Sequence, residues 1–134
     1  MHFEETAEYV TRSRGREDEG RRLHRLFDLA WDYTLHEFPE FATYVGRSEY
    51  NHLWSDHALE AYERRNREME VPARVLATIE RDRLSGADRV HHDLFKRVVE
   101  ENLEGRRFKD ADWPPHHPTA EASGLPQVRR TQAD

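Results

Sequence analysis

The pattern of apolar positions predicts an all-α protein of three to four helices. Between residues 17 and 38, apolar side chains recur at three- and four-residue spacing, which is typical of one face of a long helix. Pro39 ends this helix and favours a short one over residues 40–45. Gly46 can adopt the left-handed backbone conformation that ends a helix. The apolar stripe of the long helix comprises Leu23, Leu26, Phe27, Ala30, Tyr33, Thr34 and Phe38.

A second long helical pattern runs from residue 56 to residue 84. Ser55 or Asp56 is the candidate N-cap. Pro72 lacks a backbone donor and crowds the preceding turn, so we expect a kink or break near Glu70. The apolar side is marked by Leu59, Tyr62, Met69, Val75, Leu76 and Ile79.

A third helix is predicted over residues 86–104. Ser85 with Asp88 three residues later resembles a capping box, and Gly105 is a plausible stop. The predicted apolar face consists of Val90, Leu94, Phe95, Val98 and Val99.

The polar ends of the chain set the expected domain organisation. We expect a disordered leader over residues 1–16, a helical domain over 17–109 and a disordered, Pro-rich tail over 110–134.

Aromatic residues are concentrated between Phe27 and Trp54, where eight of the chain's 14 lie. Such a cluster can form a ligand-stacking pocket. We interpret the rings instead as part of the core, because aromatic side chains dominate burial energetics.

Composition narrows the function classes. Apolar and charged residues each make up 36% of the chain, against roughly 45–50% and about 25% in typical soluble domains, which predicts a thin core. The net charge of −6 argues against nucleic acid as the main partner. The absence of cysteine excludes disulfides, thiolate zinc sites and a cysteine nucleophile. With no signal-peptide pattern and no membrane-length apolar run, we expect a cytoplasmic location.

Histidines raise the question of a metal site. His24, Asp28, Asp32 and His36 are spaced at four-residue steps on the first helix, so neighbouring members share a face. Four-residue steps drift by about 40° each, which separates the end members by about 120°. We therefore interpret the row as a solvated polar face, together with its neighbours Arg21, Arg22 and Arg25.

His91 lies among the apolar residues of the third predicted helix. A buried histidine is a candidate ligand or acid–base group, but more often it is a core residue with one hydrogen bond. His92 is expected to point away from that face, and His116 and His117 lie in the predicted tail.

Catalytic motifs are missing. His36-Glu37 opens like a zinc-binding HExxH motif, but position 40 is Glu40 and Pro39 breaks the helix. Neither GxSxG nor the glycine-rich phosphate-binding patterns occur. The sequence thus predicts no catalytic, cofactor-binding or metal-binding residues in this chain.

Three segments carry a family resemblance. Residues 27–33 (FDLAWDY), 38–46 (FPEFATYVG) and 84–95 (LSGADRVHHDLF) resemble, in order and spacing, the opening region of the bacterial domain-of-unknown-function 885 (DUF885) family. The likeness covers roughly residues 20–109, with Phe38 where the family usually has Asn.

The resemblance implies a large, mainly α-helical metallopeptidase-like protein whose zinc-binding HExxH motif lies downstream of the region seen here. The first hypothesis is therefore a truncated, catalytically inert N-terminal helical segment whose partner is the remainder of the parent protein. Such a segment would expose Leu26, Ala30, Leu94 and Val98 and tend to self-associate. The alternatives are a stand-alone helical interaction module and, third, a small metal-binding enzyme that uses His91 or the His24–Asp28 pair.

Overall fold

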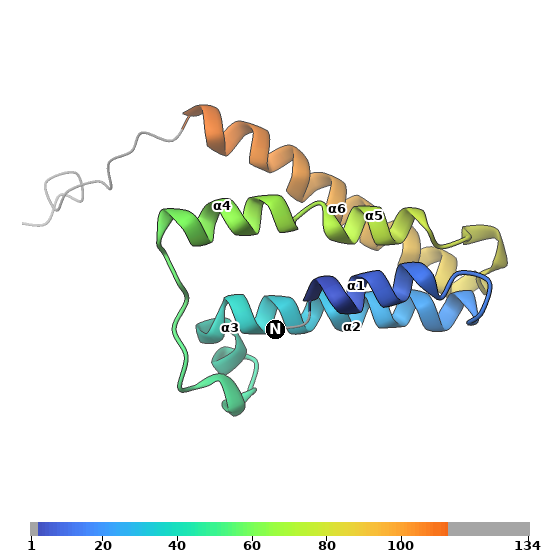
Figure 1. Cartoon of the computed structure of the whole chain (residues 1–134), viewed down its shortest axis with the longest axis horizontal. Coiled ribbons are helices and arrows are strands. Elements are labelled where there is room, and N and C mark those ends of the chain that lie inside the picture. The colour runs from blue at the N-terminus through green and yellow to red at the C-terminus, as the bar shows by residue number, and fades with distance from the viewer. Residues whose placement is uncertain (1–2, 113–134) are drawn as a thin grey trace, which may run out of the picture.

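The computed structural model describes residues 3–112, with side chains through Arg106, and confirms the all-α class (Figure 1). None of the helices in this part of the chain is long and apolar enough to cross a membrane. The elements are α1 (Phe3–Arg12), α2 (Glu19–Glu37), α3 (Pro39–Tyr44), η1 (Ser48–Tyr50), α4 (Leu59–Glu68), α5 (Val71–Ala77), η2 (Arg81–Arg83) and α6 (Gly86–Asp112), where η marks a 3₁₀ turn.

Helix α1 lies where the polar sequence of residues 1–16 predicts a disordered leader, and that prediction is wrong for residues 3–12. Phe3, Ala7 and Val10 recur at helical spacing and are all buried, and α1 packs on α2 and α5. A ten-residue helix is marginal alone and gains its stability from tertiary packing. Three apolar positions in a charged segment are too few to reveal that packing in the sequence.

Helices α2 and α3 follow the prediction. The Asp18 side chain caps α2 by accepting a hydrogen bond from the backbone N–H of Arg21 at 3.2 Å. Pro39 is the first residue of α3, and Gly46 has the predicted positive φ of 85°. Leu35, which lies outside the predicted stripe, is fully buried.

The predicted break near Glu70 is confirmed, because α4 ends at Glu68 and α5 begins at Val71, one residue before Pro72. The outer limits differ from the prediction. Asp56 accepts a hydrogen bond from the backbone N–H of Ala58, and α4 starts only after that turn. α5 ends at Ala77, because the chain then turns into η2.

Helix α6 begins as predicted, with the Ser85 hydroxyl accepting a hydrogen bond from the backbone N–H of Asp88 at 3.2 Å. The predicted stop at Gly105 is wrong, since α6 continues to Asp112. An internal glycine costs a helix only about 1 kcal/mol. Arg106 offsets this by donating to the carbonyl of Asn66 and to Glu70. The remainder of the predicted tail, including His116 and His117, lies outside the described residues.

The hydrophobic core is shared by α1, α2 and α5, with additional residues from the turns that lead into α6. It is small, as the composition predicts. Phe27, Tyr33 and Phe95 pack against its edge. The buried members are Phe3, Ala7, Val10, Leu23, Leu26, Leu29, Val71, Val75, Leu76, Ile79 and Leu84.

The interpretation of the aromatic cluster as core is wrong for most of its members. Tyr44 is 86% exposed and Trp54 82% exposed, whereas Phe27 and Tyr33 are partly buried. The reason is topological. Residues 39–58 extend away from the other helices and pack on the end of α2 (Figure 1). We call residues 39–58 the α3–η1 lobe.

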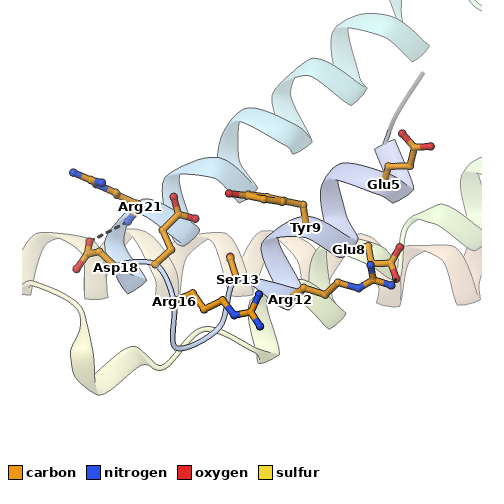
Figure 2. A pocket seen from close by; sticks show the side chains of 9 residues that line it. Glu5, Glu8, Tyr9, Arg12, Ser13, Arg16, Asp18 and Arg21 are labelled. Carbon is orange, nitrogen blue, oxygen red and sulfur yellow. Dashed lines mark hydrogen bonds and ion pairs between the residues drawn. The ribbon is translucent and has the colours of Figure 1, made fainter.

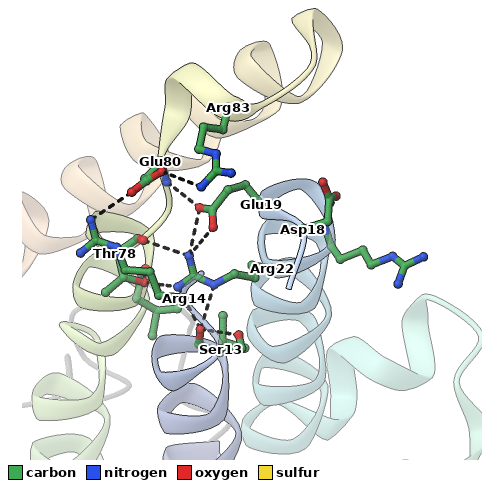
Figure 3. A network of polar contacts seen from close by, with 11 residues as sticks. Ser13, Arg14, Asp18, Glu19, Arg22, Thr78, Glu80 and Arg83 are labelled. Carbon is green, nitrogen blue, oxygen red and sulfur yellow. Dashed lines mark hydrogen bonds and ion pairs between the residues drawn. The ribbon is translucent and has the colours of Figure 1, made fainter. Parts of the chain in front are cut away.

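Arg22 is fully buried at the junction of four elements (Figure 3). Its guanidinium donates to both carboxylate oxygens of Glu19 at 2.9 and 3.0 Å and to the carbonyl of Val10 at 2.9 and 3.1 Å. It also donates to the carbonyl and the hydroxyl of Thr78 at 3.0 and 2.8 Å. Glu19 in turn accepts from the backbone N–H of Glu80 at 2.7 Å.

The prediction that Arg22 lies on a solvated face is therefore wrong, although Arg21 and Arg25 are exposed as expected. The carbonyls of Val10 and Thr78 lie at the C-terminal ends of α1 and α5. Helix ends leave such carbonyls without helical partners and favour a cation. One arginine therefore satisfies the ends of two helices.

Candidate interaction surface

An apolar groove of about 520 Å³ runs between α2, the α4–α5 break and α6. Its walls carry more apolar than polar side chains, which is typical of a surface that receives another apolar group. The residues that line it are Phe3, Phe27, Ala30, Trp31, Tyr33, Thr34, Glu68, Met69, Pro72, Phe95, Val98, Val99 and Asn102.

Ring contacts hold the walls of the groove in place. Phe27 of α2 and Phe95 of α6 have ring centroids 5.0 Å apart, and Phe3 lies 4.4 Å from Tyr33 by the same measure. The Phe27–Phe95 distance lies within the range of favourable aromatic contacts, about 4.5–7 Å, and the Phe3–Tyr33 distance lies at its lower edge. The groove thus has walls built on helices that also contribute to the core.

The exposed apolar surface extends beyond the groove at two points. Trp31 is 44% exposed and meets Phe41 of α3 edge-on, with the ring centroids 5.9 Å apart. Val98 lines the groove from α6 and is 53% exposed. The exposed face therefore continues from α6 across the groove to the α3–η1 lobe.

A charged network closes one edge of the groove. The Tyr33 hydroxyl donates to Glu68 at 2.6 Å, and Arg64 bridges Glu68 and Glu37 with bonds of 2.7 to 2.9 Å. Arg65 adds a 3.2 Å bond to Glu37. This network separates the groove from a polar cleft of about 1060 Å³ that Glu37 and Arg64 help to line.

The network shifts the pKa values of its members. Burial, followed by the hydrogen bond to Glu68, raises the pKa of Tyr33 above its ordinary value. Burial alone would raise the pKa of Glu37, but the hydrogen bonds and charges of Arg64 and Arg65 outweigh it and hold the pKa below 4.5.

The lowered pKa of Glu37 predicts acid sensitivity. Its folded-state pKa lies below the unfolded value, so this contribution is present above about pH 4.5 and is lost as the pH falls further. We expect Glu37→Gln to lower the free energy of unfolding by about 2 kcal/mol at pH 7 and by clearly less at pH 3. Urea denaturation at both pH values, with the exposed Glu63→Gln as control, measures the difference. Equal losses for Glu37→Gln at both pH values would contradict this account.

Helix α6 is rotated relative to the prediction. Val90, Leu94 and Val98 are more than half exposed, while His92 and Val99 are buried. The apolar residues of this helix cover a wide arc, so periodicity alone does not fix which part faces the core. Packing against α5 decides it, because α6 presents His92 and Val99 beside Leu76 and Ile79.

The burial of the two adjacent histidines of α6 is the reverse of the prediction. His91 is exposed and its Nδ1 lies 3.6 Å from Asp88, whereas His92 is buried, with its Nδ1 3.3 Å from Asp93. A hydrogen bond from Arg81, supported by a weaker one from His92, outweighs the opposing effect of desolvation and lowers the pKa of Asp93 to about 2. The hypothesis of a truncated segment expects Leu26, Leu94 and Val98 to be exposed. Leu26 is instead fully buried, whereas Leu94 and Val98 are exposed.

The histidine row of α2 is divided among different partners. His24 Nε2 lies 2.9 Å from Asp88 on α6, and His36 Nδ1 lies 3.6 Å from Glu37. Asp28 and Asp32 instead line a hollow between α1 and α2. Within the part of the chain that the structure describes, no three histidine or carboxylate groups are placed to hold a metal ion.

A second open hollow, of about 770 Å³, lies between α1 and the start of α2 (Figure 2). Charges of both signs line it. Arg12 pairs with Glu8, and Arg25 pairs with Glu17 while covering the ring of Tyr9. This mixture is typical of a solvated face and indicates no particular ligand.

Searches among protein-family models, curated proteins and solved structures return no match to this chain.

Proposed function

We propose that this chain works by packing its apolar groove against further helical protein, as the N-terminal helical segment of a metallopeptidase-like protein. The observation that carries the proposal is the groove itself, together with Trp31 and Val98 at its exposed rim. Burying a large apolar side chain contributes about 1.5–3 kcal/mol, and an amphipathic helix laid in a groove buries several at once.

The resemblance to the DUF885 family agrees with this assignment. Two of the three family-like segments, residues 27–33 and 84–95, supply Phe27, Trp31 and Phe95 to the groove walls. The segment at 38–46 forms α3, whose Phe41 extends the same apolar face. Residues that carry the resemblance are thus residues that build the docking surface.

Under this proposal the chain contributes packing contacts, and the remainder of the protein contributes the catalytic residues. The resemblance implies that zinc and the HExxH motif belong to that remainder. The histidines and carboxylates of the described residues then serve as local hydrogen-bonding partners, as His24 does for Asp88.

The alternative function is a stand-alone module that receives a helix from a separate protein in the same groove. The specific observation in its favour is that α1, α2 and α5 enclose a core of their own, locked by Arg22. Both functions use the groove and differ in what occupies it.

The test adds the HExxH-containing helical region of a DUF885-family protein, expressed separately, to the purified chain. We expect binding by calorimetry, and we expect Trp31→Glu to weaken it at least tenfold. Trp54→Glu is the matched control, because Trp54 is exposed but does not line the groove.

Equal binding by wild type and Trp31→Glu would overturn the groove as the docking site. Lack of binding to the family region, with Trp31-dependent binding of a synthetic amphipathic helix, would replace the first function by the stand-alone module.

A further inference from the structure

The outer surface of α6 carries an apolar stripe that meets the groove at Val98. Val90, Leu94 and Val98 are 57%, 58% and 53% exposed. At 100° per residue, the positions within about 40° of Leu94 form a single strip along the helix. We call it the outer stripe, and among the residues whose side chains the structure describes it consists of Ala87, Val90, Leu94, Val98, Glu101 and Gly105.

Four members of the outer stripe are placed symmetrically about Lys96 in the sequence, whereas Glu101 mirrors His91 beside the stripe and Val90 mirrors Asn102. Leu94 and Val98 lie two residues on either side of Lys96, and His91 and Glu101 lie five residues on either side. If two copies of α6 run antiparallel with their centres aligned at Lys96, each Leu94 meets the other copy's Val98. The same register places each exposed His91 beside a Glu101.

The ends of the stripe fit the same register. Ala87 and Gly105 each lie nine residues from Lys96, so small residues meet at both ends of the pair. Interaxial distances of packed helices are 8–10 Å and depend on the side chains at the contact. Small residues at both ends allow the two helices to stay close along the whole stripe.

We propose that the outer stripe of α6 packs against the same stripe of a second copy of this chain, with the two helices antiparallel. This isologous contact is closed and has twofold symmetry. A parallel pair would place Glu101 against Glu101, whereas the antiparallel pair places it against an imidazole. Within one chain Glu101 already accepts from Arg97 at 2.8 Å, so the partner's His91 meets a carboxylate held in position.

The pairing is independent of what fills the groove. Val98 borders both surfaces, but Val90 and Leu94 do not line the groove. A helical partner in the groove and a second copy on the outer stripe therefore share Val98 and otherwise use different residues.

Cysteine cross-linking tests the pairing directly, because the natural chain has no cysteine. In the double variant His91→Cys/Glu101→Cys, we expect a short bismaleimide reagent to give a covalent dimer in high yield. Each single variant should give at least tenfold less, since the antiparallel register keeps identical positions apart. Dimer formation by the single variants as efficiently as by the double variant would overturn the antiparallel register.

Sedimentation equilibrium measures the dimer without a reagent. We expect Leu94→Glu to raise the dissociation constant at least tenfold and Trp31→Glu to leave it within a factor of three. Unchanged circular dichroism and melting temperature in Leu94→Glu would show that the fold is retained. A wild-type chain that stays monomeric at millimolar concentration would overturn the proposal, and groove binding would still be testable through Trp31.

Discussion

Replacing Arg22 by methionine is expected to lower the free energy of unfolding by about 3–5 kcal/mol, because it removes one partner of a buried ion pair and orphans the other. Glu19 is 4% exposed and would keep only its bond from the Glu80 backbone. The carbonyl of Thr78 would lose the Arg22 donor, and the carbonyl of Val10 would keep only the Ser13 hydroxyl. The total free energy of unfolding of a small domain is roughly 5–15 kcal/mol. The loss is therefore a large part of the stability, and urea denaturation monitored by circular dichroism measures it.

Two further variants separate the lost charge pair from lost packing. In Glu19→Gln/Arg22→Met both charges are absent, so we expect this double variant to recover at least about 1 kcal/mol relative to Arg22→Met. Arg21→Met is the matched control on the exposed side of α2 and should change stability by less than about 0.5 kcal/mol. A similar loss in Arg21→Met and Arg22→Met would contradict the network as the source of stability.

Replacing Phe3 by alanine is expected to lower the free energy of unfolding by about 3 kcal/mol, because the ring is 4% exposed and packs against Tyr33 and the core. This result would establish α1 as part of the cooperative unit. The control is Tyr9→Ala on the same helix, where the ring is 53% exposed and its described contact is with Arg25. We expect that control to lose at most about 1 kcal/mol.

Equal and negligible effects of Phe3→Ala and Tyr9→Ala would mean that α1 frays in solution. Equilibrium unfolding followed by both circular dichroism and tryptophan fluorescence distinguishes the cases, because an integral α1 requires the two transitions to coincide.

Local signals in the sequence predict the helix boundaries that they control. Pro39, Gly46 and Ser85 act within a few residues of themselves, and the structure places each in the predicted role. Pro72 likewise divides the long helical pattern where expected. Chemistry that depends on neighbours in sequence is therefore readable from sequence.

Features decided by distant partners are not readable in this way. In the sequence, Arg22 is one of three arginines on a predicted polar face. Only the folded structure brings the ends of α1 and α5 beside it. His91 and His92 are adjacent, and only the contact with α5 decides which of them is buried. The groove is likewise a product of packing, since its walls come from segments as far apart as Phe27 and Val98.

The α3–η1 lobe has a consequence for how the molecule opens. It packs on α2, and its own bonds join nearby residues, as Glu40 with Ser55 and Thr43 with Asn51. The locked core of α1, α2 and α5 includes no residue from this lobe. Its amides should therefore exchange with solvent through small local openings that cost far less free energy than global unfolding. Phe41 belongs to the lobe, so one end of the apolar face is carried by a unit that can rearrange while the core stays folded.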